Sequence, residues 1–468
     1  MATSPARVAA FDILLRIEQQ HAYASELLHS SQYAKLSPAD HGLATELVMG
    51  VLRWRSLLDE EIGRFSDQRV AKLDIEVLTA LRLTAYQLLF LDRIPGRAAV
   101  HESVELVKRA RKGSAVPFAN AVLRKLAGSI SAARSPQPAV AASQELEHFS
   151  IREFAVEQRN ETGLETAAAS ARKLAHPLWL VERWERRFGL DKVRRICTYD
   201  QQAPPTAVRL TDASTEAELA RDGIDLVPGE LLACARKVRS GNVSRTRAFA
   251  EGRVSIQDEA SQLVALLVGT GSKILDCCAA PGGKTRVLAE RNPDANIVAL
   301  ELHAHRALLL RKLVLAGHVE VINSDILEFK KSANFDRVLA DVPCSGTGTL
   351  AHNPEIKWKL QPADLADLHR RQIAILRAAM QQVAPGGRLV YSTCSLEPEE
   401  NERVVDEALS SSDPAFRVVD CRLELERLRA QGELVWNDVD SLVSGRSVRT
   451  IPGVHPCDGF FVAILEKS

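Results

Sequence analysis

The stretch Ile274-Leu-Asp-Cys-Cys-Ala-Ala-Pro-Gly-Gly-Lys-Thr285 decides the fold of this chain. Two apolar residues end in Asp276, the chain turns at Pro281-Gly-Gly283, and a helical pattern resumes at Thr285-Arg-Val-Leu-Ala289. A strand, a tight glycine turn and a helix in this order predict a doubly wound α/β sheet, which binds its ligand at the carboxyl ends of its strands. Glycines let the backbone approach a ligand closely, and the free amides of a helix start favour a carboxylate or a phosphate.

Two ligand classes fit such a turn. Gly283-Lys-Thr285 resembles the end of a phosphate-binding Walker loop, but that loop needs a glycine five positions before its last glycine, and position 278 is Cys. The spacing therefore excludes a nucleoside triphosphate. A glycine turn without any ligand is common, so the choice depends on the sequence that follows.

Acidic residues end the strands that follow. Asn296-Ile-Val-Ala-Leu-Glu301 closes on an acid eighteen positions after Gly283, where a carboxylate accepts the ribose hydroxyls of an adenosine-containing cofactor. A third apolar run ends in Asp325 and a fourth in Asp341. Since parallel strands present their carboxyl ends at one edge of a sheet, the acids are expected along a single rim.

Two cysteine motifs complete the pattern. Asp341 opens Asp-Val-Pro-Cys-Ser-Gly-Thr-Gly348, and a fifth apolar run closes as Tyr391-Ser-Thr-Cys-Ser395. Together with the glycine loop, these motifs resemble those of the Nol/Nop/Sun family of S-adenosylmethionine-dependent RNA cytosine-5 methyltransferases. The resemblance covers nearly the whole chain except a linker. It implies a Rossmann-like class I methyltransferase domain, S-adenosyl-L-methionine as cofactor, RNA as partner and no metal.

The resemblance also implies cofactor contacts, position by position. Glu301 would bind the ribose and Asp325 would lie near the adenine, while Asp341 would border the cofactor as well as the base. The family usually carries Asp at the position of Glu301, and the longer acid can serve with a slightly different reach. The loop around the methionine part would consist of Cys278, Ala279, Ala280, Pro281, Gly282, Gly283 and Lys284.

Methylation at carbon 5 of cytosine explains why two cysteines are needed. Carbon 5 attacks a methyl sulfonium only after a thiolate has added to carbon 6. An ordinary thiol, with a pKa of about 8.5, is only a few per cent ionised at neutral pH, so the site must favour the thiolate. The family pattern assigns the attack to Cys394, a part in product release to Cys344, and the N3/N4 edge of cytosine to Asp341. Either cysteine alone would be read as a small buried hydrophobe, but their joint placement in two motifs favours catalysis.

The rest of the chain divides into three further parts. Residues 1–128 have helical periodicity throughout and resemble NusB-type RNA-binding domains. Residues 129–165 are rich in turn formers and are expected to be a linker. Residues 166–250 resemble the small α/β RNA-binding subdomain that precedes the catalytic fold of the family, which would span residues 251–468. Within the catalytic part, Asn353-Pro-Glu-Ile-Lys-Trp358 matches a family segment on the RNA side of the site.

Charge does not mark an RNA surface by itself. The chain has 468 residues and a net charge of zero, and residues 1–128 carry 17 Lys and Arg against 14 Asp and Glu, a net charge of +3. The densest basic cluster is Lys108-Arg-Ala-Arg-Lys112. Such a run is either a solvated helix end or a phosphate contact, and both interpretations stay open.

The positions of the cysteines and the hydropathy of the chain indicate the cellular compartment in which the protein is expected. All eight cysteines lie at or after Cys197, which favours catalytic or inert thiols in a reducing cytosol over a disulfide framework. The chain starts without a signal-peptide pattern, and no apolar run approaches membrane-spanning length. We therefore expect a soluble, cytoplasmic protein without an obligate protein partner.

The pairing with a NusB-like domain most resembles the bacterial branch of the family that acts on 16S ribosomal RNA. One alternative is a DNA cytosine-5 methyltransferase, in which Cys344 would be the nucleophile; the second cysteine, Cys394, argues against it. Another alternative is a non-catalytic RNA-binding ribosome-assembly factor, which the intact cysteines and glycine loop disfavour.

Overall fold

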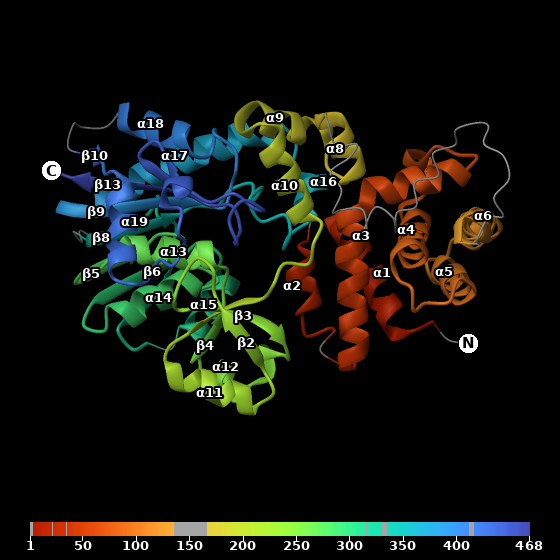
Figure 1. Ribbon diagram of the computed structural model, residues 1–468, viewed down its shortest axis with the longest axis horizontal. Helices are drawn as coiled ribbons and strands as arrows, with labels where there is room; N and C mark the ends of the chain where they lie inside the picture. Colours follow the sequence, from red (N-terminus) through yellow and green to blue (C-terminus); the bar gives the residue numbers. More distant parts are fainter. Residues whose placement is uncertain are drawn as a thin grey trace. The chain divides into compact units, whose positions relative to one another are not determined.

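The computed structural model describes residues 3–20, 22–33, 35–134, 166–314, 316–329, 335–410 and 416–468 (Figure 1). The chain forms two compact units. The helical unit comprises Met1–Gln202 and Ala351–Lys359, and the sheet unit comprises Ala203–Leu350 and Leu360–Ser468. The predicted linker lies largely outside the described residues, since the preceding helix runs to Arg134.

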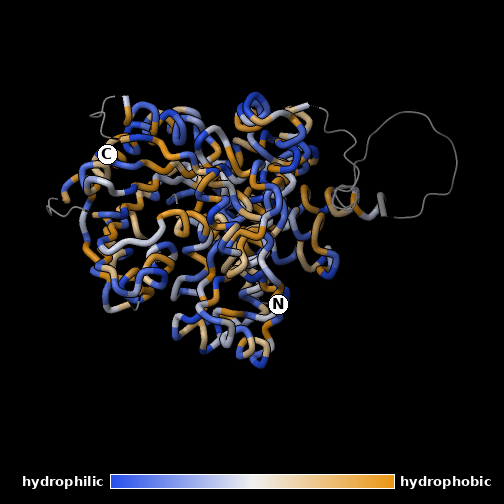
Figure 2. The backbone as a smooth tube through the Cα atoms, turned by 60° about the vertical axis from the view of Figure 1, so that its left-hand side comes forward, coloured by the Kyte–Doolittle hydropathy of each residue, from blue (hydrophilic) through white to orange (hydrophobic). Residues whose placement is uncertain are grey.

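The helical unit is built of short and long helices, as the periodicity predicts. They are α1 (Pro5–Gln20), α2 (Ala24–Leu28), α3 (Pro38–Phe65), α4 (Ile75–Phe90), α5 (Gly96–Arg109), α6 (Val116–Arg134), α8 (Ala167–Lys173), α9 (Leu178–Phe188), α10 (Leu190–Asp200) and α16 (Ile356–Lys359), with single 3-10 turns at Val70–Lys72 and Gly113–Ala115. Hydrophobic and hydrophilic residues alternate along these helices (Figure 2), as expected of helices that bury one face.

Helix α4 lies in the centre of the helical unit. It contacts α1, α3, α5 and α6, and every residue from Val77 to Leu89 is buried. The spacing of its leucines predicts burial of one face only; the polar face is buried as well because helices surround α4. Arg82, on that face, forms a bidentate ion pair with Asp59, with both N–O distances 2.7 Å, and a further contact of 3.2 Å with Glu18. These contacts compensate the cost of burying a guanidinium.

A segment of the expected catalytic domain belongs to the helical unit. Lys357 is 1% exposed, and its Nζ donates to the carbonyls of Arg53 (2.9 Å) and Ala175 (3.0 Å). The indole of Trp358 donates to the carbonyl of Leu52 at 2.6 Å. Side chains that bond to the backbone of distant helices cannot also reach a ligand, so Lys357 and Trp358 hold the segment in place.

The sheet unit contains all the strands of the described chain and the helices that cover them. Its strands are β1 (Ala207–Leu210), β2 (Asp225–Pro228), β3 (Ala235–Ser240), β4 (Val254–Ile256), β5 (Lys273–Asp276), β6 (Asn296–Glu301), β7 (Val319–Asn323), β8 (Phe335–Asp341), β9 (Val383–Thr393), β10 (Phe416–Val418), β11 (Val443–Ser444), β12 (Ser447–Arg449) and β13 (Phe461–Lys467). Its helices are α11 (Ala213–Arg221), α12 (Arg247–Ala250), α13 (Glu259–Val268), α14 (Gly283–Arg291), α15 (Ala304–Leu313), α17 (Asp364–Gln382), α18 (Glu402–Ser410) and α19 (Cys421–Ala430), with 3-10 turns at Val243–Arg245 and Val439–Leu442.

The strands form two sheets. The small sheet is antiparallel in the order β2-β3-β1-β4, and α11 and α12 pack on it over Val208, Leu219 and Val254. The large sheet has the order β11-β12-β13-β9-β8-β5-β6-β7, with β10 beside β13. Strands β5 to β9 are parallel, whereas β13 is antiparallel to β9.

The chain reverses its direction of travel across the large sheet at β5. From β5 it proceeds through β6 to β7, and then crosses back to place β8 on the other side of β5. In a doubly wound sheet the ligand crevice opens at such a switch point, between the carboxyl ends of the two strands. Asp276 ends β5 and Asp341 ends β8, so both lie beside this crevice.

Helices cover both faces of the large sheet, which confirms the predicted doubly wound class. Ile274, Leu339 and Val390 point to one core, shared with α13, α14 and α19. The next residue of β5, Leu275, belongs to the opposite core, which is shared with α17 and α18. Figure 1 shows α17 and α18 on one side of the strands and α13, α14 and α15 on the other. Because alternate residues serve different cores, the central strands contain continuous apolar runs such as Ile274–Leu275 and Ile297–Leu300.

Candidate active site

Four acidic residues meet at the carboxyl edge of the large sheet. Asp276, Glu301 and Asp341 end their strands, while Asp325 lies two residues beyond the end of β7. All four act on Cys278: burial first, and then the charges of these acids, raise the pKa of this thiol. The structure therefore places the predicted rim of acids around the glycine loop.

The loop between β5 and α14 depends on Gly282. Its φ is +118°, and a Cβ there would lie 2.7 Å from Cδ1 of Leu310, so a larger residue would be excluded on both grounds. Thr285, in the first turn of α14, donates to Oδ2 of Asp276 at 2.8 Å and fastens the loop to β5. Burial raises the pKa of Asp276 to about 7, which the bond from Thr285 opposes.

The rim fits the cofactor that the motifs imply. Oδ1 of Asp276 is buried without a hydrogen-bond partner in the described structure, and Oε1 of Glu301 accepts only the amide of His303, at 2.8 Å. Acceptors are thus available for hydroxyl and amino groups. A sulfonium and an ammonium group are cations, which a rim of carboxylates attracts.

The two motif cysteines are brought together by neighbouring strands. Cys344 follows β8 and Cys394 follows β9, and their Sγ atoms lie 3.3 Å apart. Both residues are half-buried, so a base can reach them. The hydrogen bond between the two thiols, together with burial, raises the pKa of Cys344. Cys344 therefore keeps its proton at neutral pH.

A lysine from the glycine loop lies beside this pair. Nζ of Lys284 is 2.6 Å from Oδ2 of Asp341, whose Oδ1 accepts the hydroxyl of Ser392 at 2.7 Å. Burial alone would lower the pKa of Lys284, but the charges of Asp341 and Cys394 outweigh it and raise this pKa. An ammonium that stays charged next to Cys394 favours its thiolate. The family resemblance implies a cofactor contact for Lys284, whereas its ion pair with Asp341 is evident only in the structure.

The loop after Cys344 is pressed against the start of β13. A Cβ at Gly348 would lie 2.1 Å from the carbonyl oxygen of Gly459, and the amide of Gly459 donates to the carbonyl of Gly348 at 2.8 Å. The amide of Gly348 in turn donates to the carbonyl of Cys394 at 2.9 Å. The last glycine of the motif is thus required by packing, which brings the two cysteine loops into contact.

The basic cluster of the helical unit is largely neutralised. Lys108 pairs with Glu105 at 2.8 Å, Arg109 with Asp12 at 3.3 Å, and Lys112 with Asp74 at 3.0 Å. These are surface pairs within the unit, and the run has the character of a solvated helix end.

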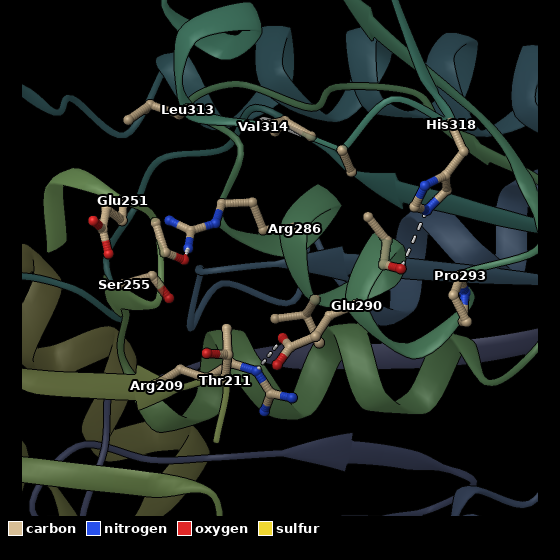
Figure 3. A pocket seen from close by; sticks show the side chains of 14 residues that line it. Arg209, Thr211, Glu251, Ser255, Arg286, Glu290, Pro293, Leu313, Val314 and His318 are labelled. Carbon is tan, nitrogen blue, oxygen red and sulfur yellow. Dashed lines mark hydrogen bonds and ion pairs between the residues drawn. The ribbon is translucent and has the colours of Figure 1, made fainter. Parts of the chain in front are cut away.

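A cavity of about 290 Å³ lies elsewhere in the sheet unit, where the small sheet meets α14 (Figure 3). Arg209 reaches across to Glu290 at 2.9 Å, and Arg286 donates to the carbonyl of Gly252. None of the residues at the acidic rim, and neither motif cysteine, lines this cavity. The cavity is therefore separate from the candidate active site, and its polar lining braces the small sheet against α14.

Neither a membrane-spanning helix nor a metal site is found among the described residues. None of their helices is long and apolar enough to cross a bilayer. None of their groups of His, Cys, Asp and Glu has the arrangement of a metal site. All eight cysteines are free thiols.

Comparison with known proteins agrees with this geometry. Residues 264–466 match the family model described as 16S rRNA methyltransferase RsmB/F, and residues 4–128 match the NusB family. The probable ribosomal RNA small subunit methyltransferase B of Bacillus subtilis is 32% identical over 100% of both chains. The ribosomal RNA small subunit methyltransferase B of Vibrio cholerae is 31% identical over 99% of this chain and 97% of its own. The solved structure of PH0851 covers 100% of both chains with a TM-score of 0.73 and 22% identity, a likeness of fold.

Proposed function

This chain belongs to the RsmB/F family of S-adenosyl-L-methionine-dependent ribosomal RNA methyltransferases, and on that premise we propose that it methylates carbon 5 of a cytidine in 16S ribosomal RNA through a cysteine adduct. The observation that carries the proposal is the pair of half-buried thiols, 3.3 Å apart, beside Asp341 and Lys284. A single thiol would serve for the attack on carbon 6 alone. A pair of thiols can serve both for this attack and for release of the methylated base from the adduct.

The acidic rim and the glycine loop hold the cofactor in this proposal. When bound, S-adenosyl-L-methionine supplies the methyl group. Glu301 would accept the ribose hydroxyls, since its Oε2 faces only Arg306 at 3.8 Å, and Asp325 would lie toward the adenine. The loop from Cys278 to Lys284 would surround the methionine part, with Gly282 and Gly283 allowing close approach.

The attack belongs to Cys394. Lys284 supports its thiolate by charge, and the raised pKa of Cys344 leaves that residue protonated, which disfavours it as nucleophile. The thiolate forms a bond to carbon 6, and the electrons of the double bond between carbons 5 and 6 become available at carbon 5. Asp341 would hold the N3/N4 edge of the base, with its carboxylate fixed by Ser392.

Release belongs to Cys344. After methylation the bond between sulfur and carbon 6 breaks, and Cys344 gives its proton to the departing Cys394 sulfur. The Cys344 thiolate takes the proton from carbon 5, and the electrons of that C–H bond restore the double bond. Cys344 is the side chain placed beside that sulfur to assist. The helical unit would contribute RNA contacts, in keeping with its NusB match, and the reaction would take place in the cytoplasm.

The decisive experiment incubates the full chain with S-adenosyl-L-methionine and 16S ribosomal RNA transcribed without modifications. We expect 5-methylcytidine at a single position, found by nucleoside mass spectrometry and mapped by bisulfite sequencing. Methyl transfer to DNA but not RNA would favour the DNA-enzyme alternative. RNA binding without any methyl transfer would favour an assembly factor.

A further inference from the structure

A buried carboxylate lies beneath the two cysteines and has no part in the mechanism so far. Glu400 is 0% exposed and lies in the turn between β9 and α18. Its Oε1 accepts the amide of Ser345 at 2.8 Å and Nε2 of Gln372 at 2.9 Å. Its Oε2 accepts the hydroxyls of both Ser345 and Ser395, the latter at 2.5 Å. Four donors on one buried carboxylate form a fully bonded network, which is rigid.

Two partners of Glu400 are the residues that directly follow the two motif cysteines. Ser345 directly follows Cys344, and Ser395 directly follows Cys394. Gln372 adds a second tie, because its Nε2 also donates to the carbonyl of Pro343 at 2.9 Å, on the other side of Cys344. A single carboxylate is thus bonded to both loops that carry the thiols.

The turn that carries Glu400 is itself fixed to β9. The hydroxyl of Tyr391 donates to the carbonyl of Glu400 at 2.6 Å. The side chain of Asn401 accepts from Thr393 at 2.5 Å and donates to the carbonyl of Ser395 at 2.8 Å. The turn that carries the carboxylate is therefore tied to β9 through Tyr391 and Thr393 and to the Cys394 loop through Ser395.

Strand pairing places the two loops at neighbouring strand ends but does not fix the distance between the sulfur atoms, which depends on how the loops continue. Neighbouring strands lie about 4.8 Å apart, whereas the Sγ atoms of Cys344 and Cys394 are 3.3 Å apart. The two loops converge beyond the strand ends, where Oε2 of Glu400 accepts from both serines.

We propose that Glu400 is a positioning residue that sets the distance between the two thiols of the methylation site. The effect of this distance on catalysis rests on the proposed function. The distance itself can be tested without any reaction on RNA. Glu400 touches neither substrate nor cofactor; it acts through Ser345 and Ser395.

The test uses the full chain with Glu400→Gln. Only one of the two amide heteroatoms can accept hydrogen bonds. Either the Ser345 amide and Gln372 or the two serine hydroxyls therefore lose their acceptor at residue 400. A misplacement of about 1 Å costs about 100-fold in rate, so we expect kcat to fall by about 10- to 100-fold. Since the loop from Cys278 to Lys284 lies outside the network, the dissociation constant of S-adenosyl-L-methionine should change by less than about twofold, which also reports that the variant is folded.

Thiol cross-linking measures the position directly. Diamide takes two hydrogens from a pair of thiols and becomes a hydrazine as the S–S bond forms. We expect rapid formation of the Cys344–Cys394 disulfide in the wild type, identified by peptide mass spectrometry, and formation slowed by about tenfold or more in Glu400→Gln. A merely structural role of Glu400 would leave this rate unchanged in a folded variant.

Matched variants complete the design. Glu399→Gln changes the neighbouring carboxylate, which pairs with Arg403 at 3.1 Å. In this variant kcat and the rate of disulfide formation should both stay within about twofold of wild type. Ser345→Ala and Ser395→Ala each remove one hydroxyl bond to Oε2 of Glu400, so each should partly slow methylation and disulfide formation. The double variant should slow them no more than Glu400→Gln does.

Two results separate this proposal from the proposed function. Unchanged cross-linking and unchanged kcat in Glu400→Gln would overturn the positioning role. Slower cross-linking in a chain whose wild type forms no 5-methylcytidine would uphold the positioning role and overturn the proposed function.

Discussion

The Sγ atoms of Cys344 and Cys394 lie 3.3 Å apart, although the residues are separated by 50 positions in the sequence. The hydrogen bond between them, together with burial, raises the pKa of Cys344. The proposed function gives the two cysteines separate roles, attack for Cys394 and release for Cys344.

Replacing each cysteine in turn should give opposite results on a denaturing gel. Cys394→Ala removes the nucleophile, so neither product nor covalent adduct should form. Cys344→Ala still permits attack and methyl transfer but slows elimination, so the protein should accumulate bound to its RNA. The double variant should trap nothing. Cys234→Ala, a half-buried thiol outside the pair, is the control. A trapped complex in Cys394→Ala and none in Cys344→Ala would reverse the assignment.

Glu301→Ala should weaken cofactor binding by roughly 1–3 kcal/mol, the range for loss of a charged hydrogen-bond acceptor. Isothermal titration with S-adenosyl-L-methionine measures the effect directly. Glu301→Asp should be mild, because the shorter acid is the usual residue at this position in the family. Asp294→Ala, at the opposite end of β6, serves as the control. An unchanged dissociation constant in Glu301→Ala would remove this residue from the site.

Lys284→Met should slow adduct formation by about 10- to 100-fold at neutral pH, because the thiolate of Cys394 loses a neighbouring positive charge. The rate should recover in part as the pH rises, since a higher pH restores the thiolate. Adduct formation on RNA containing 5-fluorocytidine, which cannot eliminate, isolates this step. Lys273→Met, at the exposed start of β5, should behave as wild type. A pH profile identical to wild type would show that Lys284 acts only on the cofactor.

Lys357 should make the stability of the helical unit depend on pH. Burial lowers the pKa of Lys357 to about 7, against the opposing charges of Asp200 and Cys197. The folded state then binds fewer protons than the unfolded state between about pH 7 and 10, so the contribution of Lys357 to stability is poorest below pH 7 and improves as the pH rises.

Urea unfolding of wild type and Lys357→Met over this range tests the effect. The wild type should gain stability relative to the variant by up to about 1.4 kcal/mol per pH unit. Burial and the charge of Lys357 lower the pKa of His176 well below its usual value, so His176 is neutral in the wild type over this range. A constant difference from pH 7 to pH 10 would contradict a neutralised Lys357.

A chain of residues 166–468 should still bind S-adenosyl-L-methionine, because the rim and the glycine loop lie in the sheet unit. It should methylate RNA poorly, since the segment Ala351–Lys359 loses its partners Leu52 and Arg53. Hydrogen exchange should show loss of protection in that segment. RNA affinity and its salt dependence should also fall if the Lys108–Lys112 cluster contacts phosphate. Full methylation by the shortened chain, with unchanged affinity, would show that the helical unit is dispensable.

The sequence by itself determined the layout of the catalytic fold. Apolar strand runs, the glycine turn and the strand-end acids are local patterns, and each of them is found in the structure between Ile274 and Asp341. The boundaries within residues 129–165 fall mostly outside the described chain. The strand Ala235–Ser240 and the pair Val443–Ser444 and Ser447–Arg449 were not predicted, because such short segments carry too little periodicity.

Only the tertiary structure decided how these patterns meet. The motif spacing gave Cys344 and Cys394 a common edge, but their distance depends on Glu400 and two serines that no motif argument singled out. The segment Asn353–Trp358 was expected on the RNA side of the site by resemblance, yet the backbone carbonyls of the helical unit hold its lysine and tryptophan. Periodicity records which face of an element is buried, whereas the identity of the partner across that face depends on the packing of distant parts of the chain, and no local pattern contains it.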